Sequence, residues 1–226
     1  MPASLYRHLD LVLIALLGLL LVAVPSLDLR VSGWFYDPQA GFYLKNEPLV
    51  QFVYGLVPWV TRTVVTGLLL FLLGAWTFWR RRDFFVKQRR TALYLLLVMI
   101  VGPGLLVNSV FKDHWGRARP SQVTEFGGSK QFTRAAIPAD QCPKNCSFVS
   151  GHASVGFYFL ALAFVLPRRR ALWLVLGTGL GLGIGLVRIM QGGHFLSDVI
   201  FCGIIVYLTA RVLHALMFPA PKPRSA

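Results

Sequence analysis

Apolar and polar stretches alternate along the chain on the length scale of a membrane-spanning helix. A bilayer core requires about 20 consecutive apolar residues per helix. About six runs of that kind are separated by charged or turn residues: 9–25, 57–79, 91–111, 152–167, 171–187 and 195–218. The pattern predicts an all-α, polytopic membrane protein, a six-transmembrane-helix bundle forming one domain over residues 1–218. The tail 219–226 is expected to be disordered.

The first apolar run also resembles a secretory signal peptide, because Arg7 and His8 precede it. A signal peptide ends at a small-x-small cleavage site. The residues Ala23-Val24-Pro25 match that pattern poorly. We therefore expect the run to be retained as a span.

Glycines form a regular repeat in the fifth run. Gly177, Gly181 and Gly185 recur every four residues, with Gly179 and Gly183 beside them. Small residues at this spacing let a neighbouring helix approach closely in a membrane. The repeat therefore predicts a packing face without chemistry.

Composition agrees with a membrane domain. Of the 226 residues, 55% are hydrophobic and 14% are charged, and the mean hydropathy is +0.60. The formal net charge of +14 could suggest a nucleic-acid partner. However, the Lys and Arg residues form short blocks between apolar runs rather than one soluble face. We therefore expect the bilayer and its anionic headgroups as partners, and no nucleic acid.

The basic blocks also predict an orientation. They lie in the connections around residues 80–90 and 168–170, and short loops rich in Lys and Arg face the cytoplasm. Both termini would lie on that side. The segments 26–56, 112–151 and 188–194 then lie on the opposite face, which is periplasmic in a bacterial inner membrane.

Two of the three cysteines, Cys142 and Cys146, lie four residues apart on the predicted periplasmic face. An oxidising compartment would allow them to form a disulfide. Two free thiols are the alternative, and we favour the disulfide. Because no His or acidic cluster with ligand spacing accompanies them, we expect no metal site.

Three polar clusters fall on that same predicted face. The first contains Lys112, Arg119 and Pro120; the second is Ser150-Gly151-His152; the third contains Arg188, His194 and Asp198. If the third span continues as a helix beyond Phe111, Lys112 and Arg119 share a face two turns apart. Pro120 restricts Arg119 to an extended or turn conformation. By itself this cluster is equally compatible with a solvated cationic rim.

The second and third clusters add chemistry. Ser150-Gly151-His152 lies where the fourth span begins, and backbone N–H groups at a helix N-terminus bind phosphate-like anions. His194 and Asp198 are one helical turn apart, so the carboxylate can accept from one ring nitrogen and leave the other free as a nucleophile or base. A purely structural His–Asp pair is the alternative. Gly192 and Gly193 allow a tight loop before His194.

Together, Lys112-x6-Arg119-Pro120, Ser150-Gly151-His152 and Arg188-x5-His194-x3-Asp198 resemble the motifs of the type 2 phosphatidic acid phosphatase family. The motifs cover about the second half of the chain. Two positions depart from the family pattern, since Val149 replaces a proline and Val187 replaces a serine. The change at Val187 removes a hydroxyl that could contact phosphate.

The resemblance implies specific roles. His194 would attack phosphorus and form a phosphohistidine, with Asp198 holding its tautomer, while His152 would protonate the leaving oxygen and then activate water. The implied phosphate ligands are Lys112, Arg119, Ser150, Gly151 and Arg188. Three of these are cations that can stabilise the equatorial oxygens, so neither a divalent metal nor another cofactor is required.

Residues near the first motif receive lesser roles. Arg117 is expected to serve the rim of the site or the substrate headgroup. His114 and Trp115 are interpreted as interface residues.

The leading functional hypothesis is a periplasm-facing, metal-independent phosphatase of a lipid monophosphate or pyrophosphate. Family substrates include lipid A, undecaprenyl pyrophosphate, phosphatidylglycerophosphate and phosphatidic acid. Cations in the segment 121–149 favour a large, multiply phosphorylated headgroup such as lipid A: Lys130, Arg134 and Lys144. A lipid-to-lipid phosphotransferase is the first alternative. A non-enzymatic lipid-binding or transport protein is disfavoured because binding needs no His–Asp pair, and a soluble haloperoxidase with similar motifs is disfavoured by the apolar spans.

Overall fold

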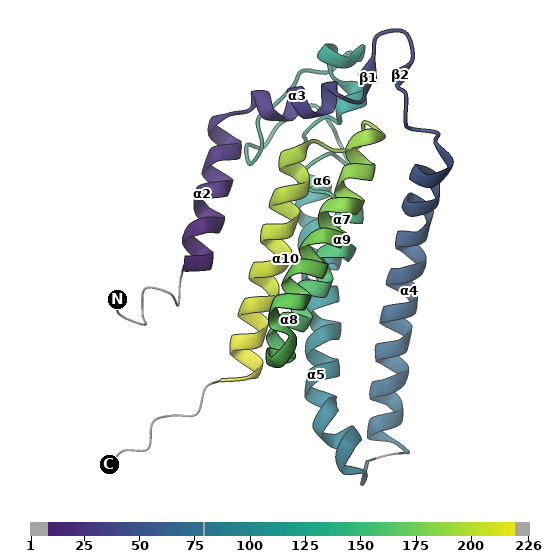
Figure 1. Cartoon of the computed structure of the whole chain (residues 1–226), viewed down its shortest axis with the longest axis vertical. Coiled ribbons are helices and arrows are strands. Elements are labelled where there is room, and N and C mark those ends of the chain that lie inside the picture. Colours follow the sequence, from purple (N-terminus) through teal and green to yellow (C-terminus); the bar gives the residue numbers. More distant parts are fainter. Residues whose placement is uncertain (1–8, 79, 220–226) are drawn as a thin grey trace.

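The computed structural model describes residues 9–78 and 80–219. It is mostly helical, with 72% helix and 3% strand, and its long helices run side by side as a bundle (Figure 1). Of the predicted tail, residues 220–226 lie outside the described residues. The same holds for Arg7, His8 and residue 79 at the end of the second predicted run.

The helices follow the apolar runs. They are α2 (Leu9–Ala23), α3 (Ser26–Gly33), α4 (Pro48–Trp76), α5 (Asp83–Met99), α6 (Lys112–His114), α7 (Gly151–Phe157), α8 (Leu162–Val165), α9 (Arg170–Met190) and α10 (Leu196–Met217). Strands β1 (Tyr36–Asp37) and β2 (Gly41–Phe42) form a short antiparallel hairpin between α3 and α4. The described residues also contain a π-helical segment, η1 (Ile100–Phe111), and four 3₁₀ turns: η2 (Pro120–Gln122), η3 (Thr124–Phe126), η4 (Tyr158–Ala161) and η5 (Pro167–Arg169).

The described residues contain four helices that are long and apolar enough to cross a bilayer: Pro48–Trp76, Asp83–His114, Pro167–Met190 and Leu196–Met217. Helices α2 and α3 meet at an 80° bend and count as a fifth span if taken together. The fourth predicted run, 152–167, corresponds to a shorter apolar helix, Gly151–Val165. The prediction of a membrane bundle is therefore confirmed, while crossings by the first and fourth predicted runs stay predictions.

The long helix Asp83–His114 changes from α-helical to π-helical turns before it reaches the polar segment after Phe111. After α5, residues Ile100–Phe111 form π-helical turns (η1) that contain Pro103. Proline lacks an N–H group and disturbs regular helical bonding. The side chain of Asn108 donates to the carbonyl of Pro103 at 2.7 Å, and that of Ser109 donates to the carbonyl of Gly104 at 3.3 Å. These side chains satisfy backbone oxygens in the widened turns.

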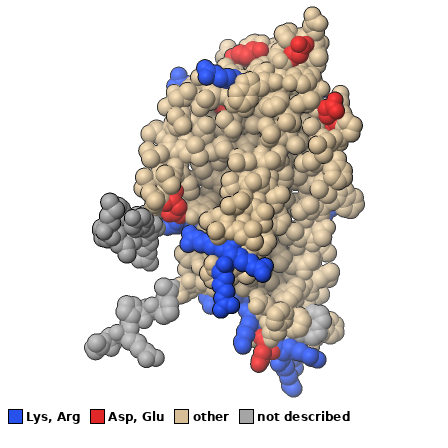
Figure 2. All heavy atoms as spheres, viewed as in Figure 1, with Lys and Arg blue, Asp and Glu red and all other residues tan. Residues whose placement is uncertain are grey.

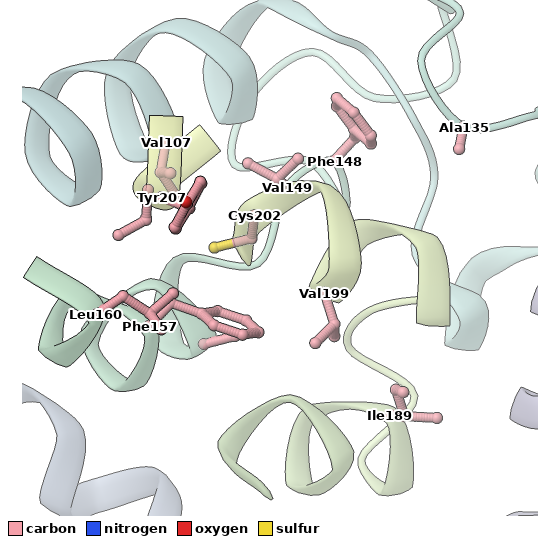
Figure 3. Close-up of a cluster of buried hydrophobic side chains, with 12 residues drawn as sticks. Val107, Ala135, Phe148, Val149, Phe157, Leu160, Ile189, Val199, Cys202 and Tyr207 are labelled. Carbon is pink, nitrogen blue, oxygen red and sulfur yellow. The ribbon is translucent and has the colours of Figure 1, made fainter. Parts of the chain in front are cut away.

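The main hydrophobic core joins side chains of η1, α7, α9 and α10 to the irregular segment before α7. Figure 3 shows ten of its side chains by name, including Phe148, Val149, Phe157, Val199 and Cys202. Val149, which replaces the proline of the family motif, is fully buried in this core. The apolar side chain therefore has a packing role there.

The glycine repeat is a packing face, as predicted. Gly177, Gly181 and Gly185 are buried, and a Cβ on Gly177 would lie 2.7 Å from the backbone nitrogen of Leu160. Nothing lies within 4 Å of a Cβ on Gly179 or Gly183. The close approach thus depends on one face of α9.

The loop before α7 is closed by a disulfide between Cys142 and Cys146. This confirms the favoured interpretation of the two cysteines. The third cysteine, Cys202, is a buried free thiol.

The glycine face generates a paired prediction. Gly177→Ala should destabilise the protein by about 1–3 kcal/mol because the new methyl group meets backbone that cannot move aside. Gly179→Ala should be neutral or stabilising by up to about 1 kcal/mol, since alanine favours helix and space is open. Thermal unfolding of both variants in detergent measures the difference. Equal midpoints for the two variants would contradict the packing role.

Candidate active site

The loop between α9 and α10 carries the third motif and requires glycine at two positions. Gly192 has a φ of +64°, in the left-handed region, and a Cβ there would meet the ring of Phe42. A Cβ on Gly193 would meet the guanidinium of Arg188. The two glycines therefore let the loop turn tightly and bring Arg188 against the residue that precedes His194, as the sequence suggested.

Arg117 lies at the centre of a buried ion cluster beneath this loop. Its side chain is fully buried. Nη1 lies 2.6 Å from Oδ1 of Asp198, and Nη2 lies 2.7 Å from Oδ2 of Asp28. The guanidinium carbon also lies 4.3 Å from the centre of the Phe195 ring. The prediction that Arg117 serves the rim or the headgroup is wrong, because two carboxylates occupy its guanidinium inside the protein.

Asp28 ties the N-terminal part of the chain into this cluster. Its Oδ1 accepts the backbone N–H of Ser197 at 2.8 Å, and its Oδ2 accepts the hydroxyl of Ser197 at 2.5 Å. Ser197 lies in the first turn of α10, where free N–H groups favour a negative charge. Asp28 is thereby bound both to a cation and to a helix start.

His194 is held by a backbone carbonyl rather than directly by Asp198. Its Nδ1 lies 2.6 Å from the carbonyl oxygen of Ser147, whereas Oδ2 of Asp198 is 3.8 Å away, beyond hydrogen-bonding distance. The hydroxyl of Ser147 donates to Oδ2 of Asp198 at 2.5 Å. The expected direct hydrogen bond from His194 to Asp198 is therefore absent from the described structure. Ser147 links the two residues instead, because its carbonyl contacts His194 and its hydroxyl donates to Asp198.

The protonation of His194 follows from this environment. A carbonyl can only accept, so Nδ1 carries the proton and Nε2 keeps its lone pair. Burial lowers the pKa of His194 to about 4, because desolvation disfavours the charged ring. At neutral pH the imidazole is uncharged and can act as a nucleophile through Nε2.

The second motif lies where α7 begins. Ser150 is fully buried, and its backbone N–H donates to the carbonyl of Asp198 at 3.2 Å. A Cβ on Gly151 would lie 3.2 Å from Nζ of Lys112, so glycine leaves room for the amine beside the helix start. Among the described residues, Nε2 of His152 and the hydroxyl of Ser150 are buried without a hydrogen-bond partner.

The three predicted phosphate-binding cations act on the same imidazoles. The charges of Lys112, Arg119 and Arg188 all act on His152. Lys112 and Arg188 also act on His194. The structure thus brings together residues from all three motifs, although they are far apart in sequence.

Arg119 reaches the site by a different route from the one expected. Helix α6 ends at His114, and Gly116 turns the chain with a φ of +71°. Lys112 and Arg119 therefore do not share a helical face. Arg119 is extended, with φ −82° and ψ 157°, as Pro120 predicted, and its Nη2 donates to the carbonyl of Asn145 at 2.8 Å.

Residues of the three motifs line two cavities. A groove of about 700 Å³ begins at Lys112, Gly151 and His152 and extends between α4 and η1. A second cavity, of about 270 Å³, includes Arg119, Arg188 and polar residues of the chain segments around them. Lys112 and His152 therefore lie at an apolar groove, while Arg119 and Arg188 lie at a polar cavity.

Sequence reasoning missed four side chains that support the site: Asp28, Tyr54, Ser147 and Gln191. Tyr54 stacks on His152, with ring centres 4.4 Å apart, and the amide oxygen of Gln191 accepts from Arg188. A carboxylate close to an apolar run could have singled out Asp28. The other three have no signal in the sequence.

Comparison with known proteins gives concordant matches. The family model described as "PAP2 superfamily" matches residues 91–222. A protein named "Lipid A 4'-phosphatase" from Francisella tularensis subsp. novicida (strain U112) is 37% identical over 197 residues, covering 86% of this chain and 87% of the relative. A protein of the same name from Rhizobium leguminosarum is 43% identical over 118 residues, covering 51% of each chain. No solved structure matches the chain.

The ion cluster generates a stability prediction. Arg117→Met should destabilise the protein by about 3–5 kcal/mol, because two buried carboxylates lose their common cation. Thermal unfolding in detergent measures this effect as a lowered midpoint. Arg134→Met is the matched control, since Arg134 is exposed and should change the midpoint little. A midpoint for Arg117→Met equal to that of the control would contradict the role of the cluster.

Proposed function

The chain belongs to the PAP2 superfamily, and from this premise we propose that it removes a phosphate from lipid A or a closely similar phosphorylated glycolipid. A relative that matches 86% of the chain carries the name "Lipid A 4'-phosphatase", and several helices of the chain are long enough to span a bilayer. The protein is a multi-pass membrane protein of the lipid phosphatase type. The lipid A headgroup, the reaction intermediate and the orientation in the membrane are parts of the proposal.

The groove between α4 and η1 is the observation that carries the proposal. Lys112, Gly151 and His152 line its upper end, and most of the remaining lining is apolar, including Val57, Val65 and Leu105. A lipid must present its phosphate to the cations while its acyl chains stay out of water. A groove that connects these two environments suits a lipid, because its apolar part can hold acyl chains that a small soluble phosphate ester lacks.

The proposed reaction has two steps. In the first, Nε2 of His194 attacks phosphorus, the bond from phosphorus to the lipid oxygen breaks, and His152 gives its proton to that oxygen. In the second, His152 takes a proton from water, whose oxygen attacks the phosphohistidine and releases inorganic phosphate. The attacking imidazole is neutral because burial lowers the pKa of His194 to about 4.

Charge stabilisation is assigned to the three cations. Phosphoryl transfer concentrates negative charge on the equatorial oxygens, and enzymes stabilise that charge with fixed cations or metal ions. Lys112, Arg119 and Arg188 lie within electrostatic reach of His152. We assign them the role that divalent metals have in other phosphoryl-transfer enzymes, so the reaction should not require a metal.

Orientation is proposed from the distribution of charge. The site lies at the end of the bundle where α7 and α10 begin, while the α4–α5 and α8–α9 connections lie at the other end (Figure 1). Most of the Lys and Arg visible in Figure 2 gather toward that other end. Loops rich in Lys and Arg remain in the cytoplasm, which favours a bacterial inner membrane protein whose site faces the periplasm.

The substrate preference is proposed from the segment before α7. Lys130, Arg134 and Lys144 are exposed there, and Lys144 directly precedes Asn145, which contacts Arg119. Cations around the phosphate site favour a headgroup with more than one negative charge. Lipid A, with phosphates on a disaccharide, fits this better than a lipid with a single small headgroup.

The reaction gives a direct test. Purified protein in detergent with EDTA should release inorganic phosphate from lipid A faster than from undecaprenyl pyrophosphate, phosphatidylglycerophosphate or phosphatidic acid. His194→Ala should lower the rate at least about a thousandfold, because no other group replaces the nucleophile. His114→Ala is the matched control, since His114 is exposed and lies outside the proposed chemistry.

Three results would change the assignment. Retained activity in His194→Ala would contradict the phosphohistidine mechanism, and complete loss with EDTA would contradict metal independence. Disappearance of the lipid phosphate without free inorganic phosphate would instead indicate transfer to another lipid.

The groove gives a second test. Thr61 lines the groove, and Thr61→Trp should fill part of it and lower kcat/KM for long-chain lipid phosphates about 10-fold or more, since even small misplacement of a substrate is costly. Short-chain phosphate esters should be hydrolysed almost as by the wild type. Thr63→Trp is the control, because Thr63 is exposed on the same helix and does not line the groove. Equal losses for both chain lengths would argue against acyl chains in the groove.

A further inference from the structure

Among the described residues, Tyr54 is the aromatic side chain of α4 that packs against the proposed site. Its ring lies parallel to that of His152, with centres 4.4 Å apart and an angle of 13° between the planes. The guanidinium carbon of Arg188 lies 4.7 Å from the centre of the same ring. Tyr54 thus contacts both the proposed general acid and a proposed phosphate ligand.

The position of Tyr54 in the chain makes this contact independent of the three motifs. Tyr54 lies before the region 91–222 that the family model matches. It lines the polar cavity together with Gln51, while Val57, one turn further along α4, lines the apolar groove. Tyr54 therefore stands at the boundary between the two cavities.

His152 has few other restraints on its orientation. Its Nε2 is buried without a hydrogen-bond partner among the described residues. Burial, together with the charges of Lys112, Arg119 and Arg188, acts against a positive charge on the ring. An aromatic face offers the opposite effect, because its electron density attracts a cationic ring stacked on it.

Resting on the proposed phosphatase function, we propose that Tyr54 is a positioning residue for this reaction. The Tyr54 ring holds the imidazole of His152 in the orientation from which that imidazole delivers its proton to the leaving oxygen. It also holds Arg188 at the phosphate. The tyrosine itself forms no bond to the substrate and gives up no proton.

The role predicts a dependence on the leaving group. When the bond between phosphorus and an alkyl oxygen breaks, the departing alkoxide needs the proton that His152 supplies. A nitrophenolate departs without a proton. Loss of a residue that positions the acid should therefore slow alkyl phosphates much more than a nitrophenyl phosphate, whereas a general loss of structure would slow both equally.

The experiment compares Tyr54→Leu, Tyr54→Phe and wild type in detergent, with an alkyl phosphate and 4-nitrophenyl phosphate as substrates. Tyr54→Leu should lower kcat for the alkyl phosphate about 10- to 100-fold and that for the nitrophenyl ester less than about 3-fold, as expected for a displaced general acid. Tyr54→Phe keeps the ring and should restore most of the lost rate. In a His152→Ala background, Tyr54→Leu should have little further effect on the alkyl phosphate.

The matched control is Phe52→Leu, since Phe52 lies on the same helix with 64% of its surface exposed and should keep the wild-type ratio of the two rates. Monodisperse elution and an unchanged unfolding midpoint establish that a variant is folded, and Tyr54→Gln serves as a second non-aromatic variant. Equal loss on both substrates, or failure of Tyr54→Phe to recover activity, would overturn the positioning role. Absence of activity in the wild type would instead overturn the proposed phosphatase function.

Discussion

The buried ion cluster of Arg117, Asp28 and Asp198 is the interaction on which the arrangement of the site depends. Both carboxylates lie within 2.7 Å of the guanidinium, inside the protein. Removing charges from water is costly unless they are paired and hydrogen-bonded, so the cluster is stable only when α3, the loop after α6 and the start of α10 are assembled together. Because Asp198 accepts the hydroxyl of Ser147, whose carbonyl holds His194, the same cluster sets the orientation of the proposed nucleophile.

The site combines two opposed electrostatic conditions. His194 lies in a buried position that keeps it neutral, while Lys112 and Arg188 place positive charge around it. Lys112 and His152 lie at one end of an apolar groove, which in the proposed reaction lets a lipid present its phosphate while its acyl chains stay out of water.

Much of the fold could be predicted from local pattern. The bilayer thickness requires long apolar helices, and the hydropathy of the chain located them to within several residues. The repeat of Gly177, Gly181 and Gly185 predicted a close packing face because glycine spacing is a local property of one helix. The crossing by residues 152–167 stays a prediction, since the segment Gly151–Val165 is short. The partners of that segment decide its course more than its own hydropathy does.

The sequence by itself determined which residues are proposed to carry the chemistry, because the spacing of His194 and Asp198 and the order of the three motifs can be read from one chain. Only the tertiary structure decided how those residues are held. Arg117 looked like a rim cation, yet its partners Asp198 and Asp28 lie 81 and 89 positions away. Ser147 and Tyr54 likewise act through contacts between separate segments. Such contacts depend on how the helices pack and leave no periodicity or spacing in the sequence, so folding alone could assign them.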